Sequence, residues 1–387
     1  DVGSLTIEKY EGKENEFDKP FPDIGFTIYK VADIEQNYNE GSKQIELQYK
    51  SLVKGLEITS DTKYDAATKA VIDAAVKTDD LKGTTQKTAL TKDGKKAVAK
   101  FDNLAVGVYL VVETYAPSQV VKPSANFLVS IPMTSNDGDD WVYDVVAQPK
   151  NETVYGGVTL IKQGKRLLAD DKNSEETVGL AGVTFELQEK KGGKWENVDE
   201  CTTGNGKNGT TLGQIHVEGL APGTYRFVET KGVDGYIADG ETAYEFTVGN
   251  DGKVNDEETH TITVTNEKPD LDKTVKQGED KDGKAIYGTD ADYSVGDMVE
   301  WKVSVSVPSN IAKLKTFKVV DEMSEALTWK PKGNDLKVVT DTGTELTASV
   351  DYTLDAPQAD TEGAKWTITV TNDGKAKLAN VRRIDIT

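Results

Sequence analysis

Short runs in which apolar and polar residues alternate recur along the whole chain, and they predict β-strands. In the run Trp141–Ala147 every second residue is apolar, which is the period of a half-buried strand. Pro149 cannot donate a ladder hydrogen bond, so we expect this strand to end there and to leave Lys150 at its rim. Comparable runs bounded by turn residues predict further strands at Gly25–Val31, Val158–Lys162, Gly182–Leu187, Thr259–Thr265, Met298–Val307, Thr316–Val320 and Trp366–Val370.

Only one segment has a convincing helical pattern. In Asp65–Lys77 the first residue could cap a helix, and Ala67, Val71 and Ala75 share one face of it. The final segment, Val381–Thr387, is predicted as a strand that lacks a partner. Many short strands with turns between them predict an all-β fold of tandem immunoglobulin-like β-sandwich domains, with one short helix in the first domain.

An internal repeat divides the chain into domains. Asn103–Thr114 and Gly219–Thr230 lie 116 residues apart and share seven of twelve positions, among them Glu113 and Glu229. Self-similarity at this spacing indicates duplicated domains rather than a short-period solenoid. A glycine-containing linker after Lys150 and a turn before a new strand pattern supply the boundaries. We therefore predict domains at 1–151, 152–268 and 269–387, the last of them truncated at its C-terminal end.

Composition and charge narrow the class of function. The counts of 46 Lys+Arg and 66 Asp+Glu give a net charge of −20, which argues against binding to nucleic acid or to anionic membranes. No apolar run approaches the ~18 residues of a membrane-spanning helix, and the single Cys201 excludes an internal disulfide framework. His216 and His260 lie in different predicted strands, Asp280–Gly283 lacks the glutamate of a calcium loop, and Asn136–Asp140 is expected to be a hairpin loop. We therefore predict no metal and no cofactor.

A lysine, a glutamate and an asparagine of the second block form a candidate reactive set. Lys162 lies on its first predicted strand and Asn266 on its last, and these strands are often neighbours in a sandwich. Burial would lower the pKa of Lys162 and free its amine as a nucleophile. A buried Glu229 would stay protonated and donate to the Asn266 side-chain carbonyl, so that attack on the amide carbon with loss of ammonia leaves an isopeptide bond. Alternatively, Lys162 extends to solvent and Glu229 forms an ion pair at the rim.

Two segments resemble those of a known family. Trp141–Asn151 resembles the pilin motif of Gram-positive backbone pilins, although Gln148 stands where the family usually has tyrosine. Tyr225–Thr230 is similar to the E-box of collagen-adhesin B-type domains. The family's E-box glutamate assists a bond between a first-strand lysine and a last-strand asparagine. The resemblance thus implies a B-type second domain in which Glu229 promotes a crosslink between Lys162 and Asn266.

The first and third blocks resemble related domains. The first, also B-type, keeps the E-box glutamate, and whether Lys9 and Asn151 are crosslinked there is left open. The third resembles the A-type sister domain, in which an aspartate takes the role of the glutamate. That resemblance implies Lys273, or less favourably Lys276, as the nucleophile and Asp321 as the acid, with a partner asparagine expected beyond the end of the chain. The motifs that carry it are Leu271–Val275, Tyr293–Trp301 and Phe317–Ser324.

The resemblance implies the major structural subunit of a covalently polymerised pilus (fimbrium) in the cell wall of a Gram-positive bacterium, outside the cell. Lys150 would be the acceptor that a class C sortase joins to the sorting-signal threonine of the next subunit. The partners would be the class C sortase, other copies of the chain in a head-to-tail polymer and ancillary pilins, with no nucleic acid and no membrane contact within this fragment. The chain would be a sortase substrate rather than an enzyme, and its only own chemistry would be autocatalytic isopeptide formation. The sorting signal itself is expected beyond this chain.

Two other functions remain open. The chain could be an ancillary basal or tip pilin, or an adhesin that binds a host or bacterial surface ligand. It could also be a secreted enzyme with accessory sandwich domains, which would need a pair of carboxylates in a cleft lined with aromatic residues. The pilin reading makes a geometric prediction that separates the lysines. Lys162 and Lys273 should be buried and face inward, whereas Lys150 should be reachable from outside.

Overall fold

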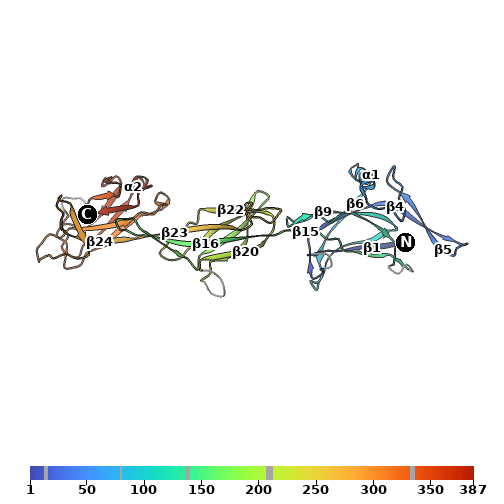
Figure 1. Ribbon diagram of the computed structural model, residues 1–387, viewed down its shortest axis with the longest axis horizontal. Helices are drawn as coiled ribbons and strands as arrows, with labels where there is room; N and C mark the ends of the chain where they lie inside the picture. The colour runs from blue at the N-terminus through green and yellow to red at the C-terminus, as the bar shows by residue number, and fades with distance from the viewer. Residues whose placement is uncertain (13–15, 79–80, 136–139, 206–211, 332–335) are drawn as a thin grey trace. The chain divides into compact units, whose positions relative to one another are not determined.

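The computed structural model describes residues 1–12, 16–78, 81–135, 140–205, 212–331 and 336–387. These residues form two compact units (Figure 1). The first unit contains Asp1–Gly157 with the segments Glu218–Gly223 and Thr247–Glu258, and the second contains Val158–Val217, Thr224–Phe246 and Thr259–Thr387. The division into domains at 1–151, 152–268 and 269–387 stays a prediction. In the described part of the chain, no helix is both long and apolar enough to cross a membrane.

The first unit is a sandwich whose first and last strands lie side by side. Strands β1 and β14 run parallel, with Ser4 opposite Asp144 and Ile7 opposite Ala147. One sheet has the order β14-β1-β8-β7 and the other β11-β9-β4-β5, with β6 also paired to β4. The strands are β1 (Val2–Glu8), β4 (Gly25–Asn39), β5 (Gln44–Ser51), β6 (Gly83–Lys87), β7 (Ala89–Leu90), β8 (Ala97–Ala105), β9 (Gly107–Tyr115), β11 (Phe127–Ile131) and β14 (Asp144–Ala147). Short pairs add β2 (Tyr10–Glu11) with β3 (Lys19–Pro20), β10 (Val120–Lys122) with β15 (Glu152–Thr153), and β12 (Met133–Thr134) with β13 (Trp141–Val142).

The predicted pilin-motif strand is divided in two. Trp141–Val142 forms β13, Tyr143 follows as a bend, and Asp144–Ala147 forms β14. Val145 is buried and its neighbours are not, so the alternation predicted for a half-buried strand holds only over β14. The strand ends two residues before Pro149, and Lys150 lies beyond it as predicted.

An added lobe with its own apolar cluster extends from β4. The predicted helix is present as α1 (Ala66–Lys77), and the Asp65 side chain accepts hydrogen bonds from the backbone N–H groups of Ala67 and Thr68. Figure 1 shows α1 near β4. Ile72 is the buried residue of the helix, and it belongs to a cluster that also contains Val31, Ala32, Ile34, Val53, Ile58, Leu81, Val108 and Leu110. Because Val108 and Leu110 lie on β9, the lobe shares its core with the sandwich.

Most of a second sandwich, which has the same parallel pairing, lies in the N-terminal part of the second unit. Strand β16 runs beside β23 from the pair Val158–His260 to the pair Leu167–Pro269. The sheets have the orders β17-β16-β20, with β23 also paired to β16, and β19-β18-β21-β22. The strands are β16 (Gly156–Leu167), β17 (Glu175–Gly179), β18 (Thr184–Lys191), β19 (Lys194–Thr202), β20 (Gln214–Leu220), β21 (Gly223–Lys231), β22 (Ala243–Val248) and β23 (His260–Pro269). The tandem β-sandwich fold predicted from the strand pattern is confirmed.

The C-terminal sheets of the second unit correct one prediction. Residues 381–387 were expected to form a strand without a partner, but β31 (Arg383–Ile386) lies between β26 and β28. Its Ile384 and Ile386 are buried; alternation reveals a strand but not its neighbours. One sheet has the order β25-β24-β26-β31-β28 and the other β27-β30-β29. They comprise β24 (Leu271–Glu279), β25 (Ala285–Gly288), β26 (Trp301–Ser306), β27 (Lys318–Glu322), β28 (Val338–Thr340), β29 (Tyr352–Asp355) and β30 (Lys365–Val370).

A short helix in these C-terminal sheets escaped the sequence pattern. Helix α2 (Asn372–Lys377) is preceded by the single-turn η1 (Ile311–Lys313) earlier in the chain. Thr371 caps α2, and its hydroxyl accepts a hydrogen bond from the Gly374 N–H. Six residues with a central glycine are too few to show helical periodicity, so this helix could not be predicted from the sequence pattern.

Candidate functional site

Lys162, Glu229 and Asn266 meet in the core between β16, β21 and β23. Each of the three residues is at most 2% exposed. Lys162 Nζ donates to Asn266 Oδ1 at 2.5 Å and lies 2.9 Å from Glu229 Oε2. Asn266 Nδ2 donates to Glu229 Oε1 at 2.7 Å. The carboxylate of Glu229 therefore contacts both the amine and the amide nitrogen. If the amine replaces the amide nitrogen, the amine loses protons and the amide nitrogen gains them.

The parallel pairing of β16 and β23 explains why these residues meet. Lys162 on β16 lies opposite Val264 on β23. Asn266 is two residues beyond Val264 on β23, so the side chains of Lys162 and Asn266 point to the same face of the sheet. Burial lowers the pKa of Lys162, and the neighbouring Glu229 only partly opposes this. One contact differs from the expectation. Glu229 accepts from the Asn266 amide nitrogen rather than donating to its carbonyl oxygen, which instead faces Lys162.

The first unit contains the same arrangement, built from Lys9, Glu113 and Asn151. Lys9 is fully buried at the end of β1, and its Nζ donates to Asn151 Oδ1 at 2.7 Å. The Lys9 amine lies 3.4 Å from Glu113 Oε2, and Asn151 Nδ2 donates to Glu113 Oε1 at 2.8 Å. Burial is the main cause that lowers the pKa of Lys9 to about 8. The set that the sequence left open is thus brought together as completely as the second one.

Two additional groups distinguish the first set. Lys9 Nζ also donates to the Pro149 carbonyl at 2.8 Å. Ser124 donates to Glu113 Oε2 through its backbone N–H at 3.2 Å and its hydroxyl at 2.7 Å. The amine and the carboxylate thus have further partners here, and the Lys9–Glu113 distance of 3.4 Å is longer than the Lys162–Glu229 distance of 2.9 Å. The sequence offered no sign of Ser124, because a serine contact with a distant strand leaves no periodic pattern.

Lys273 and Asp321 form an ion pair. The prediction that Lys273 is buried is wrong. Its Nζ donates to both carboxylate oxygens of Asp321 at 2.8 Å, and its side chain is 27% exposed. The reason lies in the pairing of β24. Among the residues that the structure describes, 271–274 pair with β26 alone, and β25 joins only from Val275 onwards. Lys273 therefore lies on an open edge. Lys276, the less favoured alternative, pairs with Glu279 at 2.8 Å.

Lys150 lies outside these three sets, although it immediately precedes Asn151. It is half-buried rather than fully solvated. Its amine donates to the backbone carbonyl of Glu16 and lies 4.6 Å from the centre of the Phe17 ring and 5.6 Å from that of Tyr10. The sequence did not predict these aromatic contacts, because residues 10 and 17 come from the opposite end of the first unit's chain.

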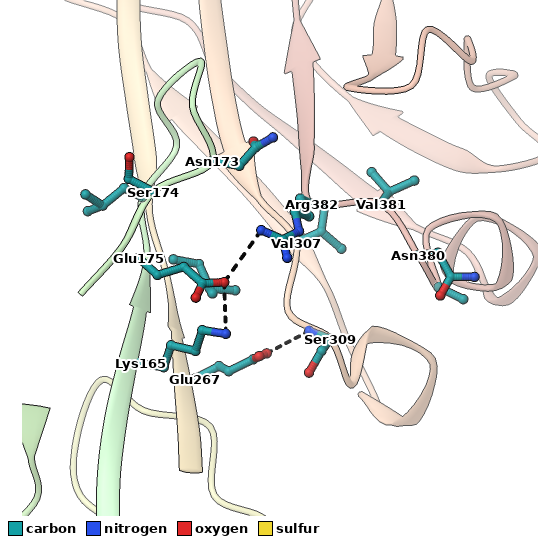
Figure 2. Close-up of a pocket in the computed structure, with 13 residues that line it drawn as sticks. Lys165, Asn173, Ser174, Glu175, Glu267, Val307, Ser309, Asn380, Val381 and Arg382 are labelled. Atoms are coloured by element: carbon teal, nitrogen blue, oxygen red, sulfur yellow. Dashed lines mark hydrogen bonds and ion pairs between the residues drawn. The ribbon is translucent and has the colours of Figure 1, made fainter. Parts of the chain in front are cut away.

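A polar hollow of about 260 Å³ in the second unit is a poor candidate for a substrate site (Figure 2). Its charged groups are tied to each other: Glu175 pairs with Lys165 at 2.8 Å and with Arg382 at 3.7 Å. Glu267 accepts from the Ser309 N–H at 2.7 Å. The hollow is also smaller than most ligand pockets. Internal ion pairing therefore accounts for its polar lining.

The remaining candidates are the acidic segments at 136–140 and 280–283 and Cys201. Among the described residues, no three His, Cys, Asp or Glu side chains cluster in a way that could hold a metal ion. Asp280 closes a turn by accepting from the N–H groups of Asp282 and Lys284, while residues 136–139 of the other acidic segment lie outside the described residues. Cys201 is half-buried, and burial raises the pKa of its thiol to about 11, which disfavours the reactive thiolate.

Comparisons with known proteins identify the class. Residues 4–152 match the family model of the Gram-positive pilin subunit D1, N-terminal domain, and residues 167–268 match that of the prealbumin-like fold domain. The fimbrial subunit type 2 of Actinomyces naeslundii is 27% identical over 180 residues, which are 42% of this chain and 31% of the relative. The fimbrial subunit type 1 of Actinomyces viscosus is 32% identical over 136 residues, which are 34% of this chain and 20% of the relative. The chain thus spans about a third or less of these relatives.

A solved structure of BcpA, the major pilin subunit of Bacillus cereus, is 25% identical, and the match covers 60% of this chain and 57% of that one. Its TM-score of 0.34 is too low to establish a common arrangement. The two family models and the fimbrial relatives are the findings that identify the class. These matches support a Gram-positive pilin subunit with immunoglobulin-like domains in a cell-surface pilus.

Proposed function

We propose that this chain is the major subunit of a covalent pilus, with Lys150 as the acceptor that a class C sortase joins to the sorting-signal threonine of another copy. One observation carries the proposal: Lys150 has surroundings different from those of Lys9 and Lys162. Lys9 and Lys162 are buried and each faces an asparagine and a glutamate. Lys150 is half-buried and faces a backbone carbonyl and two rings instead.

The two buried sets support intramolecular crosslinks. With its proton transferred to Glu229, the Lys162 amine would attack the side-chain amide carbon of Asn266. The carboxyl would then return this proton to the amide nitrogen, which also takes up the second proton that the attacking nitrogen releases and leaves as ammonium. Glu229 is thereby regenerated as a carboxylate, and an amide joins the two side chains. The bridging distances of 2.9 Å and 2.7 Å suit this relay. Lys9, Glu113 and Asn151 would react in the same way.

The third lysine would depend on a strand outside this chain. Lys273 and Asp321 are in contact, and among the described residues 271–274 pair only with β26, so their other edge could accept a strand that carries the partner asparagine. We therefore propose no crosslink at Lys273 within residues 1–387.

Crosslinks at these positions would protect the fibre under tension. Each would join the first strand of a sandwich to its last, because β1 pairs with β14 and β16 with β23. A force applied to one end strand would pass through the amide bond to the other, and the ladder hydrogen bonds would carry little of it. Such a bond also withstands reducing conditions, which a disulfide does not.

Transfer of a labelled Leu-Pro-x-Thr-Gly peptide by a class C sortase tests the acceptor role. The label should reach Lys150, and Lys150→Ala should abolish transfer. Lys122→Ala is the matched control, because Lys122 is an exposed lysine of the same unit that pairs with Glu152. Equal labelling of the Lys150→Ala variant and the unchanged chain would overturn the proposal. Antibody labelling along the whole fibre, rather than at its tip or base, would separate a major subunit from an ancillary one.

A further inference from the structure

Three residues near the N-terminus, Tyr10, Glu16 and Phe17, contact the Lys150 amine. The Tyr10 and Phe17 rings meet edge to face, with centres 5.5 Å apart and planes at 87°, and the amine lies near both rings. The carbonyl of Glu16 accepts a hydrogen bond from the same amine. Two aromatic faces and a carbonyl oxygen are the groups that attract an ammonium ion.

Three consecutive residues, Lys9, Tyr10 and Glu11, each contact a residue at or shortly after position 150. Lys9 contacts Asn151 and Tyr10 contacts Lys150. The next residue, Glu11, accepts a hydrogen bond from the Tyr155 hydroxyl. The acceptor lysine is therefore flanked by anchored neighbours, so its backbone is held and only its side chain is left to be oriented.

We propose that Tyr10 and Phe17 form an aromatic clamp that presents the Lys150 amine in one orientation to the acyl-transfer partner. The proposal rests on the acceptor role of Lys150, and it makes the two aromatic residues positioning residues of that site. A free lysine side chain samples many rotamers, and fixing it in advance spares the partner that cost.

The clamp would act before the chemical step. In transfer, the Lys150 ammonium gives one proton to the solvent, and its neutral Nζ bonds to the acyl carbon. The bond from that carbon to the sortase cysteine then breaks, and the sulfur leaves as a thiol with the second proton of Nζ. As the amine loses its charge it also loses its attraction to the ring faces, so the clamp releases the side chain when the new amide forms.

Phe17 is the residue to change, because it is 45% exposed and its loss leaves the core intact. For Phe17→Ala we expect the maximal rate of peptide transfer to fall roughly two- to five-fold, the range of an exposed cation–π contact. Phe17→Leu should be equally slow, whereas Phe17→Tyr and Phe17→Trp should restore the rate. The control is Tyr115→Ala, which removes the ring 4.0 Å from the Lys87 amine and should change nothing at Lys150.

Limited acetylation gives a second readout that needs no sortase. Without the Phe17 ring, Lys150 should be acetylated faster than in the unchanged chain, relative to Lys122. A transfer rate for Phe17→Ala at or above that of the unchanged chain, or unchanged acetylation, would overturn the clamp. Failure of the acceptor role looks different: Lys150→Ala would keep its transfer activity, while Phe17→Ala would still alter the acetylation of Lys150.

Discussion

Replacement of Asn266 by alanine removes the second crosslink, together with the hydrogen bonds between Asn266 and its two neighbours Lys162 and Glu229. The change removes the amide carbon that Lys162 would attack but leaves the Lys162–Glu229 ion pair, with its 2.9 Å separation, in place. Removing either charged partner would be less clean, because it would also leave an unpaired buried charge, itself worth about 3–5 kcal/mol.

The size of the effect follows from the loop that the crosslink closes. Lys162 and Asn266 are 104 residues apart. By analogy with a disulfide, closing a loop of that length lowers the entropy of the unfolded chain enough to stabilise the fold by about 5 kcal/mol. For a domain of about 100 residues, a loss of that size should lower the melting temperature by at least about 20 °C.

Calorimetry of the complete chain, with intact mass measured on the same sample, provides the assay. The matched control is Thr265→Ala, which removes the 2.9 Å hydrogen bond between Gln163 and Thr265 on the same pair of strands. That single contact contributes about 1 kcal/mol, so the control should melt only a few degrees lower than the unchanged chain. If Asn266→Ala melts together with Thr265→Ala, the crosslink does not stabilise this sandwich and the reasoning fails.

Three further predictions concern the first unit. The difference between the calculated and the observed mass should be about 17 Da smaller for Asn151→Ala than for the unchanged chain, because one crosslink and its loss of ammonia are absent. An equal difference in both chains would refute the Lys9 crosslink. In that variant Lys9 stays unreacted, and its pKa rises from about 8 when folded to 10.5 when unfolded. The unfolded state then binds more protons between these pH values, so stability relative to the crosslinked chain should increase by about 3 kcal/mol from pH 8 to 10.5; a flat profile in chemical denaturation would contradict it. Asp65→Ala removes the cap of α1 and should cost about 1 kcal/mol in the same assay, whereas no loss would show that the cap is redundant.

Much of the second site could be predicted because its signals are local and repeated. The alternation of Val158–Lys162 and Thr259–Thr265 revealed the strands, and the repeated glutamate placed Glu229 between them. Neighbouring first and last strands then brought Lys162 to Asn266, as the structure shows. The orientation of the Asn266 amide was less predictable. Either its nitrogen or its oxygen could face Glu229 until the position of Lys162 was known.

Other features depend on contacts that no local pattern records. The central place of β31 between β26 and β28 follows from packing of Ile384 and Ile386, not from its alternation. The exposure of Lys273 follows from an open strand edge. The aromatic neighbours of Lys150 come from more than 130 residues away, as does the Glu16 carbonyl at a separation of 134 residues.

Intact-mass spectrometry of the purified chain tests the central claim most directly. Two internal crosslinks, Lys9–Asn151 and Lys162–Asn266, predict a mass about 34 Da below the value calculated from the sequence, one ammonia for each bond. Peptide mapping should then find both pairs joined and Lys150 free. A chain with its full calculated mass, or one in which Lys150 is joined internally, would contradict the account.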